Sequence, residues 1–192
     1  PETVRKVMFS GESMPVSQLR IWREALPDAK FVNLYGPTEI TCNCTYYKVE
    51  KDFQDQDRLP IGRALPGRKV FLTDENQNEI VIPGKIGEIC VAGESLSDGY
   101  YNQPEQTEEK FVTYLCEQRT YRTGDEGYYG TDGELYFAGR KDFQIKHMGR
   151  RIELEEIENA LSGIPGVDSS ICVFDRDRNR IIGFYKGKPA SG

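Results

Sequence analysis

The sequence predicts an α/β segment, then a small distorted antiparallel β-barrel, then the beginning of an α+β unit. Two apolar strand-like runs flank an amphipathic helix within residues 1–49. Short strand-like runs then alternate with turn residues through residues 50–141. From residue 142 onward, a strand, an amphipathic helix and two further strands follow. We therefore expect one domain over residues 1–141, with its two parts meeting near residue 49, and a second domain that begins at residue 142.

The first segment is predicted to be a strand–helix–strand unit with strands at 4–9 and 30–35. Pro15 suits the first turn of a helix that Ser13 would cap. The helix is expected to bury the apolar positions that recur at three- and four-residue spacing, namely Leu19, Trp22, Ala25 and Leu26. In open α/β sheets, ligands gather beyond the carboxyl ends of the strands. The residues just after position 35 are therefore candidates for a site.

The remaining elements follow from the same patterns. Residues 41–49 are an expected strand and the acidic residues 50–58 an expected solvated loop. The antiparallel region is predicted to hold strands at 69–73, 88–92 and 134–137 and a helix at 104–111. The last unit is predicted to hold a strand at 143–148, a helix with the apolar face Leu154, Ile157, Leu161 and Ile164, and a hairpin at 167–174 and 181–186.

Composition excludes several classes of function. The 192 residues carry a net charge of -6, which argues against a partner that is a nucleic acid or an anionic membrane surface. No apolar run approaches the roughly 18 residues that a membrane span requires. The five cysteines are scattered and odd in number, which is typical of reduced thiols in a cytoplasmic protein. His147 is the only histidine, and we interpret it as structural.

Cys42 and Cys44 allow two interpretations, a metal pair or core packing. One residue separates them and no second pair follows, so a zinc site is disfavoured. Alternate residues on a strand point to one face, which favours core packing for both thiols.

The turn after the second strand, NLYGPTE at residues 33–39, carries the main candidates for chemistry. Gly36 permits a close backbone approach or a positive φ, and Pro37 fixes its own φ. Thr38 and Glu39 supply a hydroxyl and a carboxylate, which suit a phosphate oxygen and a divalent cation. Taken alone, such a turn is usually only a turn.

Three further motifs follow in order: GEICVAG at 87–93 running on to GYY at 99–101, YRTGD at 121–125, and GRKDFQIK at 139–146. With residues 33–39, this series resembles the adenylate-forming enzymes, which include amino-acid adenylation domains, acyl- and aryl-CoA ligases and luciferases. Asn33 before YGPTE resembles the amino-acid-activating branch, and FQIK with ELEEIE at 153–158 is similar to D-alanine:carrier-protein ligase. The resemblance makes residues 1–141 the end of a large α/β N-terminal domain and residues 142–192 the start of a small C-terminal domain.

The resemblance implies a role for each matching residue. Tyr35 would lie against adenine, with Asn33 and Gly36 beside it, and the alternative for Tyr35 is packing at a strand end. Thr38 would contact phosphate and Glu39 would bind Mg²⁺, against a merely solvated carboxylate. Asp125 would accept both ribose hydroxyls, since one carboxylate can take two O–H donors. Arg140 would hold ribose or phosphate oxygens of ATP or AMP, against a salt bridge at a domain edge.

Two residues after position 141 match the moving part of these enzymes. Asp142 matches the hinge about which the C-terminal domain rotates between making the adenylate and passing the acyl group to a thiol. Lys146 would reach the nucleotide in one of these states, against simple exposure on a strand.

Five further positions match the walls of the amino-acid pocket: Met8, Ser10, Leu34, Cys42 and Asn43. They are small to medium in size and uncharged, which predicts a small neutral amino acid. Core packing is the alternative for Met8 and Cys42. Ser10 stands where a D-alanine ligase is expected to have Cys.

The function that the resemblance implies is ATP-dependent formation of an aminoacyl-AMP and transfer to the phosphopantetheine thiol of a carrier protein. The sequence begins without Met and lacks the family's phosphate loop and its catalytic lysine, so we expect a fragment that is inactive alone. The alternatives are an acyl- or aryl-CoA ligase, a non-catalytic nucleotide-binding module, and a structural β-domain without a ligand.

Overall fold

The computed structural model describes residues 3–113, 118–141, 144–147, 150–175 and 178–188. The chain divides into two compact units, Pro1–Lys141 and Asp142–Gly192. Most of the elements are strands. Among the described residues, no helix combines the length and apolar character that crossing a bilayer requires.

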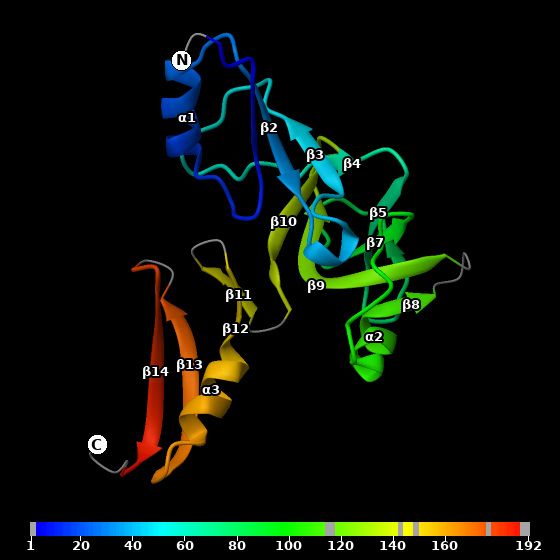
Figure 1. Ribbon diagram of the computed structural model, residues 1–192. Coiled ribbons are helices and arrows are strands. Elements are labelled where there is room, and N and C mark those ends of the chain that lie inside the picture. Colours follow the sequence, from blue (N-terminus) through cyan, green and yellow to red (C-terminus); the bar gives the residue numbers. More distant parts are fainter. Residues whose placement is uncertain (1–2, 114–117, 142–143, 148–149, 176–177, 189–192) are drawn as a thin grey trace. The chain divides into compact units, whose positions relative to one another are not determined.

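The first sheet of the first unit has the strand order β1-β2-β3-β4 (Figure 1). Strands β1 (Lys6–Phe9) and β2 (Lys30–Tyr35) are parallel and are connected by helix α1 (Val16–Ala25). Strands β3 (Thr45–Lys48) and β4 (Arg63–Ala64) extend the sheet in antiparallel fashion. The predicted strand–helix–strand unit is confirmed, and β2 ends at the 33–39 motif.

Helix α1 differs from the prediction in its start and in its buried face. It begins at Val16 with Pro15 at the N-cap position and no side-chain cap, so the predicted capping by Ser13 is wrong. Val16, Leu19 and Leu26 are buried, whereas Trp22 is 53% exposed. Trp22 is therefore not a core residue.

The connection from β2 to β4 also corrects two expectations. The predicted strand at 41–49 shortens to β3 because Thr41 and Cys42 have left-handed φ values of 60° and 73°. The 50–58 loop is not wholly solvated, since Phe53 is buried in the α1 core and its ring meets that of Tyr47 edge-on at 6.2 Å.

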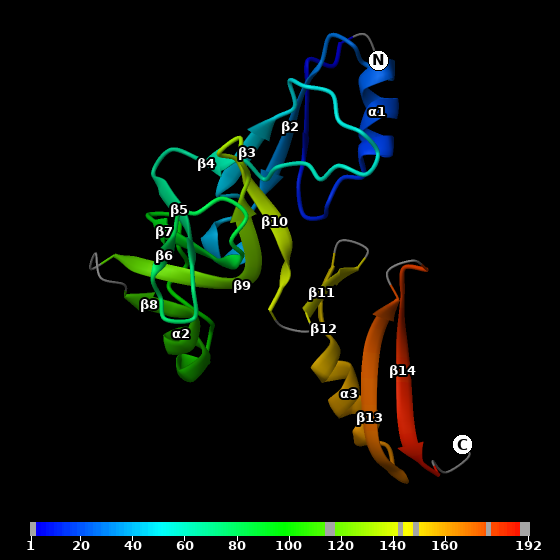
Figure 2. The ribbon, with the colours of Figure 1, turned by 180° about the vertical axis from the view of Figure 1, so that it is seen from behind.

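The second sheet has the strand order β10-β9-β7-β5-β6, with β8 also pairing β9 (Figure 2). Its neighbouring strands are antiparallel: β5 (Arg68–Thr73), β6 (Glu79–Ile80), β7 (Gly87–Gly93), β8 (Phe111–Thr113), β9 (Arg119–Tyr129) and β10 (Leu135–Arg140). The sheet curls as half of a barrel and stays open in this strand order, so the expected distorted antiparallel β-barrel is only partly formed. The expected helix at 104–111 is α2 (Pro104–Lys110).

One core joins the two sheets. Tyr35 and Ile40, from β2 and the short 3-10 helix η1 (Thr38–Ile40) after it, pack in a cluster with Leu72, Ile89 and Tyr121 of the second sheet. Since η1 carries the candidate phosphate and metal residues, this core places them against β7 and β9.

The second unit is a hairpin, a helix and a second hairpin. Its elements are β11 (Gln144–His147), β12 (Arg150–Glu153), α3 (Leu154–Ser162), β13 (Val167–Asp175) and β14 (Arg180–Gly187). Ser170 donates from β13 to the carbonyl of Glu158 on α3 at 2.7 Å, so the helix packs on that hairpin. His147 has a structural environment, since its ring meets Phe174 edge-on at 5.6 Å and its Nδ1 lies 3.2 Å from Asn179 Oδ1.

Candidate nucleotide site

A bulge in β9 carries the candidate ribose ligand. Glu88 pairs with Glu126 and Cys90 with Arg122, so residues 123–125 of β9 stand opposite Ile89 alone. Gly124 adopts φ +71°, which suits glycine at a bulge. Asp125 is buried in the interior of the first unit, where it is 2% exposed.

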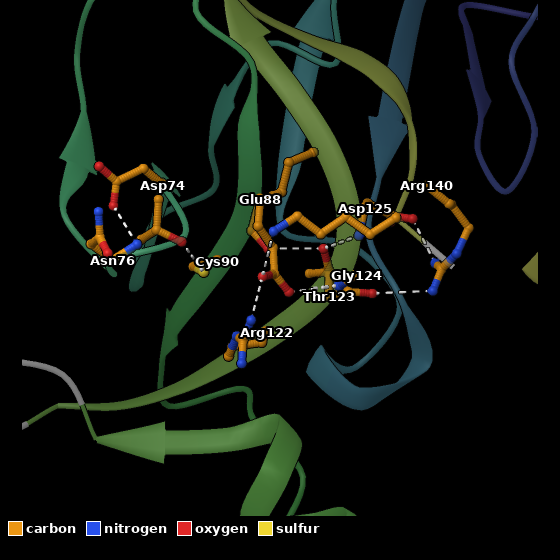
Figure 3. Close-up of polar contacts among 12 residues, drawn as sticks. Asp74, Asn76, Glu88, Cys90, Arg122, Thr123, Gly124, Asp125 and Arg140 are labelled. Atoms are coloured by element: carbon orange, nitrogen blue, oxygen red, sulfur yellow. Dashed lines mark hydrogen bonds and ion pairs between the residues drawn. The ribbon is translucent and has the colours of Figure 1, made fainter. Parts of the chain in front are cut away.

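Asp125 contacts two other predicted site residues, which come from different motifs. The hydroxyl of Tyr35 donates to Asp125 Oδ2 at 2.5 Å. Arg140 Nη1 forms an ion pair with Asp125 Oδ1 at 2.5 Å, and its Nη2 donates to the carbonyl of Thr123 at 3.3 Å (Figure 3). The β9–β10 register sets Arg140 directly opposite Asp125.

Burial and the adjacent negative charge of Asp125 raise the pKa of Tyr35 well above its usual value. Tyr35 therefore stays a protonated donor through the neutral range. This buried pairing resembles the strand-end packing that was the alternative for Tyr35, and the Arg140 contact resembles the salt-bridge alternative. Both contacts also line up the groups that the resemblance assigns to nucleotide binding.

Glycine is required at position 36 because there is no room for a side chain, not because the backbone has a positive φ. A Cβ at this position would lie 2.7 Å from both Asn43 Cα and the carbonyl oxygen of Cys42. These are backbone atoms that a small rotation cannot move aside. The turn after β2 is therefore pressed against the loop that leads to β3.

Thr38 and Glu39 have different environments. Thr38 is exposed at the first position of η1, after Pro37. Glu39 is only 6% exposed, so the alternative of a simply solvated carboxylate is wrong. The hydroxyl of Tyr100 donates to Glu39 Oε1 at 2.7 Å, and Tyr121 Oη lies 3.2 Å from Tyr100 Oη.

The residues around Glu39 are compatible with Mg²⁺. Mg²⁺ is usually held by one or two carboxylates together with water and substrate phosphates. Among the described residues, no cluster of three or more His, Cys, Asp or Glu side chains could form a complete protein cage. A single carboxylate at Glu39, the residue that follows the exposed Thr38, fits a metal that is shared with a phosphate.

Asn33 faces the interior rather than an open surface. It is 7% exposed, and its side-chain amide donates to the carbonyl of Pro60 at 2.8 Å. This bond holds the segment before β4 against β2. A role of Asn33 in holding adenine stays a prediction.

Four of the predicted pocket residues form two pairs, one on a face of the first sheet and one joined by a hydrogen bond. Met8 and Leu34 lie on one face of β1 and β2, because Met8 pairs with Val32 and Leu34 is two residues further along. The Ser10 hydroxyl donates to Asn43 Oδ1 at 2.7 Å. Met8 is 61% exposed, so it is not a core residue.

Cys42 is exposed, whereas Cys44 is buried. The two thiols do not share a face, because the left-handed turn at Cys42 ends the strand alternation. Core packing is therefore correct for Cys44 and wrong for Cys42. Burial raises the pKa of the Cys44 thiol to about 12.

Two predicted residues are not tested by the geometry. Asp142 lies outside the described residues. Lys146 belongs to β11, but its side chain is not among those described.

An open hollow of about 880 Å³ lies elsewhere on the first unit, between the Lys51 loop and the stacked rings of Tyr128 and Tyr136. It contains none of the predicted site residues.

Sequence reasoning missed two residues of the candidate site, Tyr100 and Glu88. Each stands inside a motif that the sequence analysis identified, 99–101 and 87–93.

Comparison with known proteins identifies the family. A model of the family of AMP-binding enzymes matches residues 1–101. The chain is 42% identical over 166 residues to the D-alanine–D-alanyl carrier protein ligase of Streptococcus equi subsp. equi, covering 86% of this chain and 32% of that protein. It is 39% identical over 171 residues to surfactin synthase subunit 1 of Bacillus subtilis, covering 88% of this chain and 5% of that protein. The chain thus spans about a third of the length of the ligase.

Solved structures give the same family. The protein PA1221, which contains adenylation and PCP domains and was solved in its holo form with a vinylsulfonamide inhibitor, has a TM-score of 0.87 at 35% identity, covering 96% of this chain and 33% of that one. The Vibrio cholerae adenylation domain AlmE, solved in complex with glycyl-adenosine-5′-phosphate, has a TM-score of 0.85 at 28% identity, covering 96% of this chain and 36% of that one. The family model matches more than half of the residues of this chain, so the chain belongs to the family of AMP-binding enzymes.

Proposed function

We propose that the protein activates a small neutral amino acid with ATP, forming aminoacyl-AMP and pyrophosphate, and then transfers the aminoacyl group to a carrier-protein thiol. The observation that carries this proposal is the contact of Tyr35, Asp125 and Arg140. Three separate sequence motifs supply these residues, and the fold brings them within hydrogen-bonding distance. The likeness to a D-alanine–carrier protein ligase and to adenylation domains supports the proposed reaction.

In this proposal the ribose binds at Asp125. Each carboxylate oxygen has two lone pairs, so Asp125 can accept two sugar hydroxyls while it keeps its contact with Arg140. The ribose replaces the Tyr35 hydroxyl at Oδ2, and the freed ring of Tyr35 lies against adenine. Arg140 remains at Oδ1 and offsets the charge of the carboxylate.

The phosphates bind at the turn after β2. Thr38 donates its exposed hydroxyl to a phosphate oxygen, and Glu39 holds Mg²⁺ together with the phosphates. A bound Mg²⁺ supplies neutralisation of phosphate charge. The carboxylate of the amino acid attacks the α-phosphorus, a P–O bond forms, and pyrophosphate leaves with the electrons of the broken P–O bond.

The amino acid binds over the face of β1 and β2 that carries Met8 and Leu34, with Ser10, Cys42 and Asn43 at its end. None of these side chains carries a fixed charge, which favours a small neutral substrate, with D-alanine among the candidates. Asp142 serves as the hinge and Lys146 as a nucleotide contact when the second unit changes position. The acceptor is the phosphopantetheine thiol of a carrier protein.

The test is amino-acid-dependent ATP–pyrophosphate exchange on the full natural protein. The panel contains D-alanine, L-alanine, glycine, charged amino acids, and fatty and aryl acids. Exchange with one small neutral amino acid is expected. Exchange only with a fatty or aryl acid would assign a CoA ligase, and exchange with none would favour a binding module. The same assay on the isolated 192 residues tests the expectation that they are inactive alone.

A further inference from the structure

The bulge that carries Asp125 is held by a residue of the neighbouring strand. Residues 123–125 lie opposite a single residue of β7, so the regular ladder cannot satisfy all of their backbone groups. Thr123 Oγ1 donates to the carbonyl of Ile89 at 2.8 Å and accepts from the Asp125 N–H at 2.9 Å. The Gly124 N–H donates to Glu88 Oε1 at 3.1 Å. A side chain of β7 thus replaces the missing ladder partner (Figure 3).

Glu88 is a buried charge with two cationic partners. Its side chain is 5% exposed, and Oε2 lies 2.8 Å from Arg122 Nη2 and 3.6 Å from Lys141 Nζ. The backbone N–H of Lys141 also donates to the carbonyl of Gly124 at 2.9 Å. Both backbone groups of Gly124 are therefore fixed, one by Glu88 and the other by Lys141.

We propose that Glu88 is a positioning residue for ribose recognition. This inference rests on the proposed function, in which Asp125 binds the sugar. Gly124 precedes Asp125 and has a left-handed φ, which glycine can adopt but which glycine alone does not fix. Glu88 fixes this conformation by accepting a hydrogen bond from the Gly124 N–H. It thereby sets the direction in which the Asp125 carboxylate points. Glu88 itself does not touch the nucleotide.

A merely stabilising role of Glu88 would have a different signature. Loss of general stability would weaken binding of every nucleotide alike. Loss of the Asp125 orientation would weaken only those nucleotides that present ribose hydroxyls. The informative quantity is therefore the ratio of the dissociation constants of 2′,3′-dideoxy-ATP and ATP.

The experiment measures this ratio by calorimetry on the full natural protein, on Glu88→Leu, and on Glu126→Leu. Leucine has no acceptor for the Gly124 N–H, whereas glutamine would keep one. Glu126 is the ladder partner of Glu88, so its variant makes the same charge change on the same strand pair. We expect Glu88→Leu to weaken ATP binding by about tenfold and dideoxy-ATP binding less than twofold, because the displaced Asp125 loses one charge-assisted contact to the sugar. The ratio in Glu126→Leu is expected to stay that of the natural protein.

The inference is overturned if folded Glu88→Leu keeps the natural ratio, or if both nucleotides weaken equally. If Glu88→Leu does not fold, Glu88→Asp is judged by the same ratio, because its shorter carboxylate keeps the charge but withdraws from the Gly124 N–H. A natural protein that does not prefer ATP to dideoxy-ATP would instead refute ribose binding at Asp125, and the proposed function with it.

Discussion

Tyr35→Phe tests whether the Tyr35 hydroxyl and the ribose compete for Asp125. The variant removes the donor at Asp125 Oδ2 and keeps the aromatic ring. A hydrogen bond to a charged group contributes about 1.5–3 kcal/mol net, so we expect the free energy of unfolding to fall by about 2 kcal/mol. The natural protein must break this bond when ATP binds, whereas the variant does not. ATP affinity is therefore expected to rise by up to about thirtyfold, since about 1.4 kcal/mol corresponds to tenfold.

The assay combines denaturant unfolding with calorimetric titration of ATP on the full natural protein. Tyr128→Phe is the matched control, because Tyr128 is another tyrosine of the first unit, and its ring stacks on that of Tyr136 with the ring centroids 5.3 Å apart. The control is expected to leave ATP affinity unchanged. Weaker ATP binding in Tyr35→Phe would refute the reasoning, because it would mean that the hydroxyl helps to hold the nucleotide.

Three further outcomes are expected. Tyr100→Phe removes the hydroxyl that donates to Glu39, the predicted metal ligand, and should raise the half-saturating Mg²⁺ concentration in pyrophosphate exchange about threefold. Tyr101 is 98% exposed, so Tyr101→Phe is the control. An equal rise in both variants would contradict the prediction. Brief iodoacetamide treatment with peptide mapping should label exposed Cys42 before Cys44, and the amino-acid substrate should slow Cys42 labelling; unchanged labelling with substrate would remove Cys42 from the pocket. Hydrogen bonds from Asn78 lower the pKa of Asp74 in the folded protein. The ionised Asp74 therefore stabilises the fold fully at pH values above its unfolded-state pKa, and this stabilisation is lost as the pH falls through its folded-state pKa. Asp74→Asn should thus be less stable at neutral pH, with a gap that closes in acid unfolding titrations; a gap independent of pH would contradict this.

Part of the element order was predictable because those elements have local causes, whereas β9 and β12 were not among the predicted strands. Strand β2 and helix α2 lie within one residue of the predicted bounds, since apolar alternation and Pro104 at a helix start are local signals. The buried face of α1 was not predictable in the same way. Trp22 and Arg23 are both at helical spacing from Leu19 and Leu26, and the tertiary structure buries Arg23 further through contacts with the Lys51 carbonyl and Asp52.

The failure at Cys42 has a different cause. Alternation along a strand holds only while φ stays extended, and Thr41 and Cys42 both leave that region. No glycine marks the break, so the sequence contains no local sign of it. The exposed thiol therefore follows from the close approach of this loop to Gly36, which is a tertiary contact.

The candidate site divides along the same line between local and tertiary causes. The motifs identify the residues that would face a nucleotide, whereas the residues that hold them come from distant strands: Glu88 lies 36 positions from Gly124, and Tyr100 lies 61 from Glu39. Their pairing depends on the register of β7 against β9, which no local pattern encodes. One sign was nevertheless available, since Glu88 is a charge within an otherwise buried apolar strand. A buried carboxylate needs hydrogen-bonding or charged partners. In a strand whose own backbone is already paired, such a residue indicates that a neighbouring strand departs from regular pairing and has unpaired backbone groups to offer it. In this chain the departure is the bulge that presents Asp125.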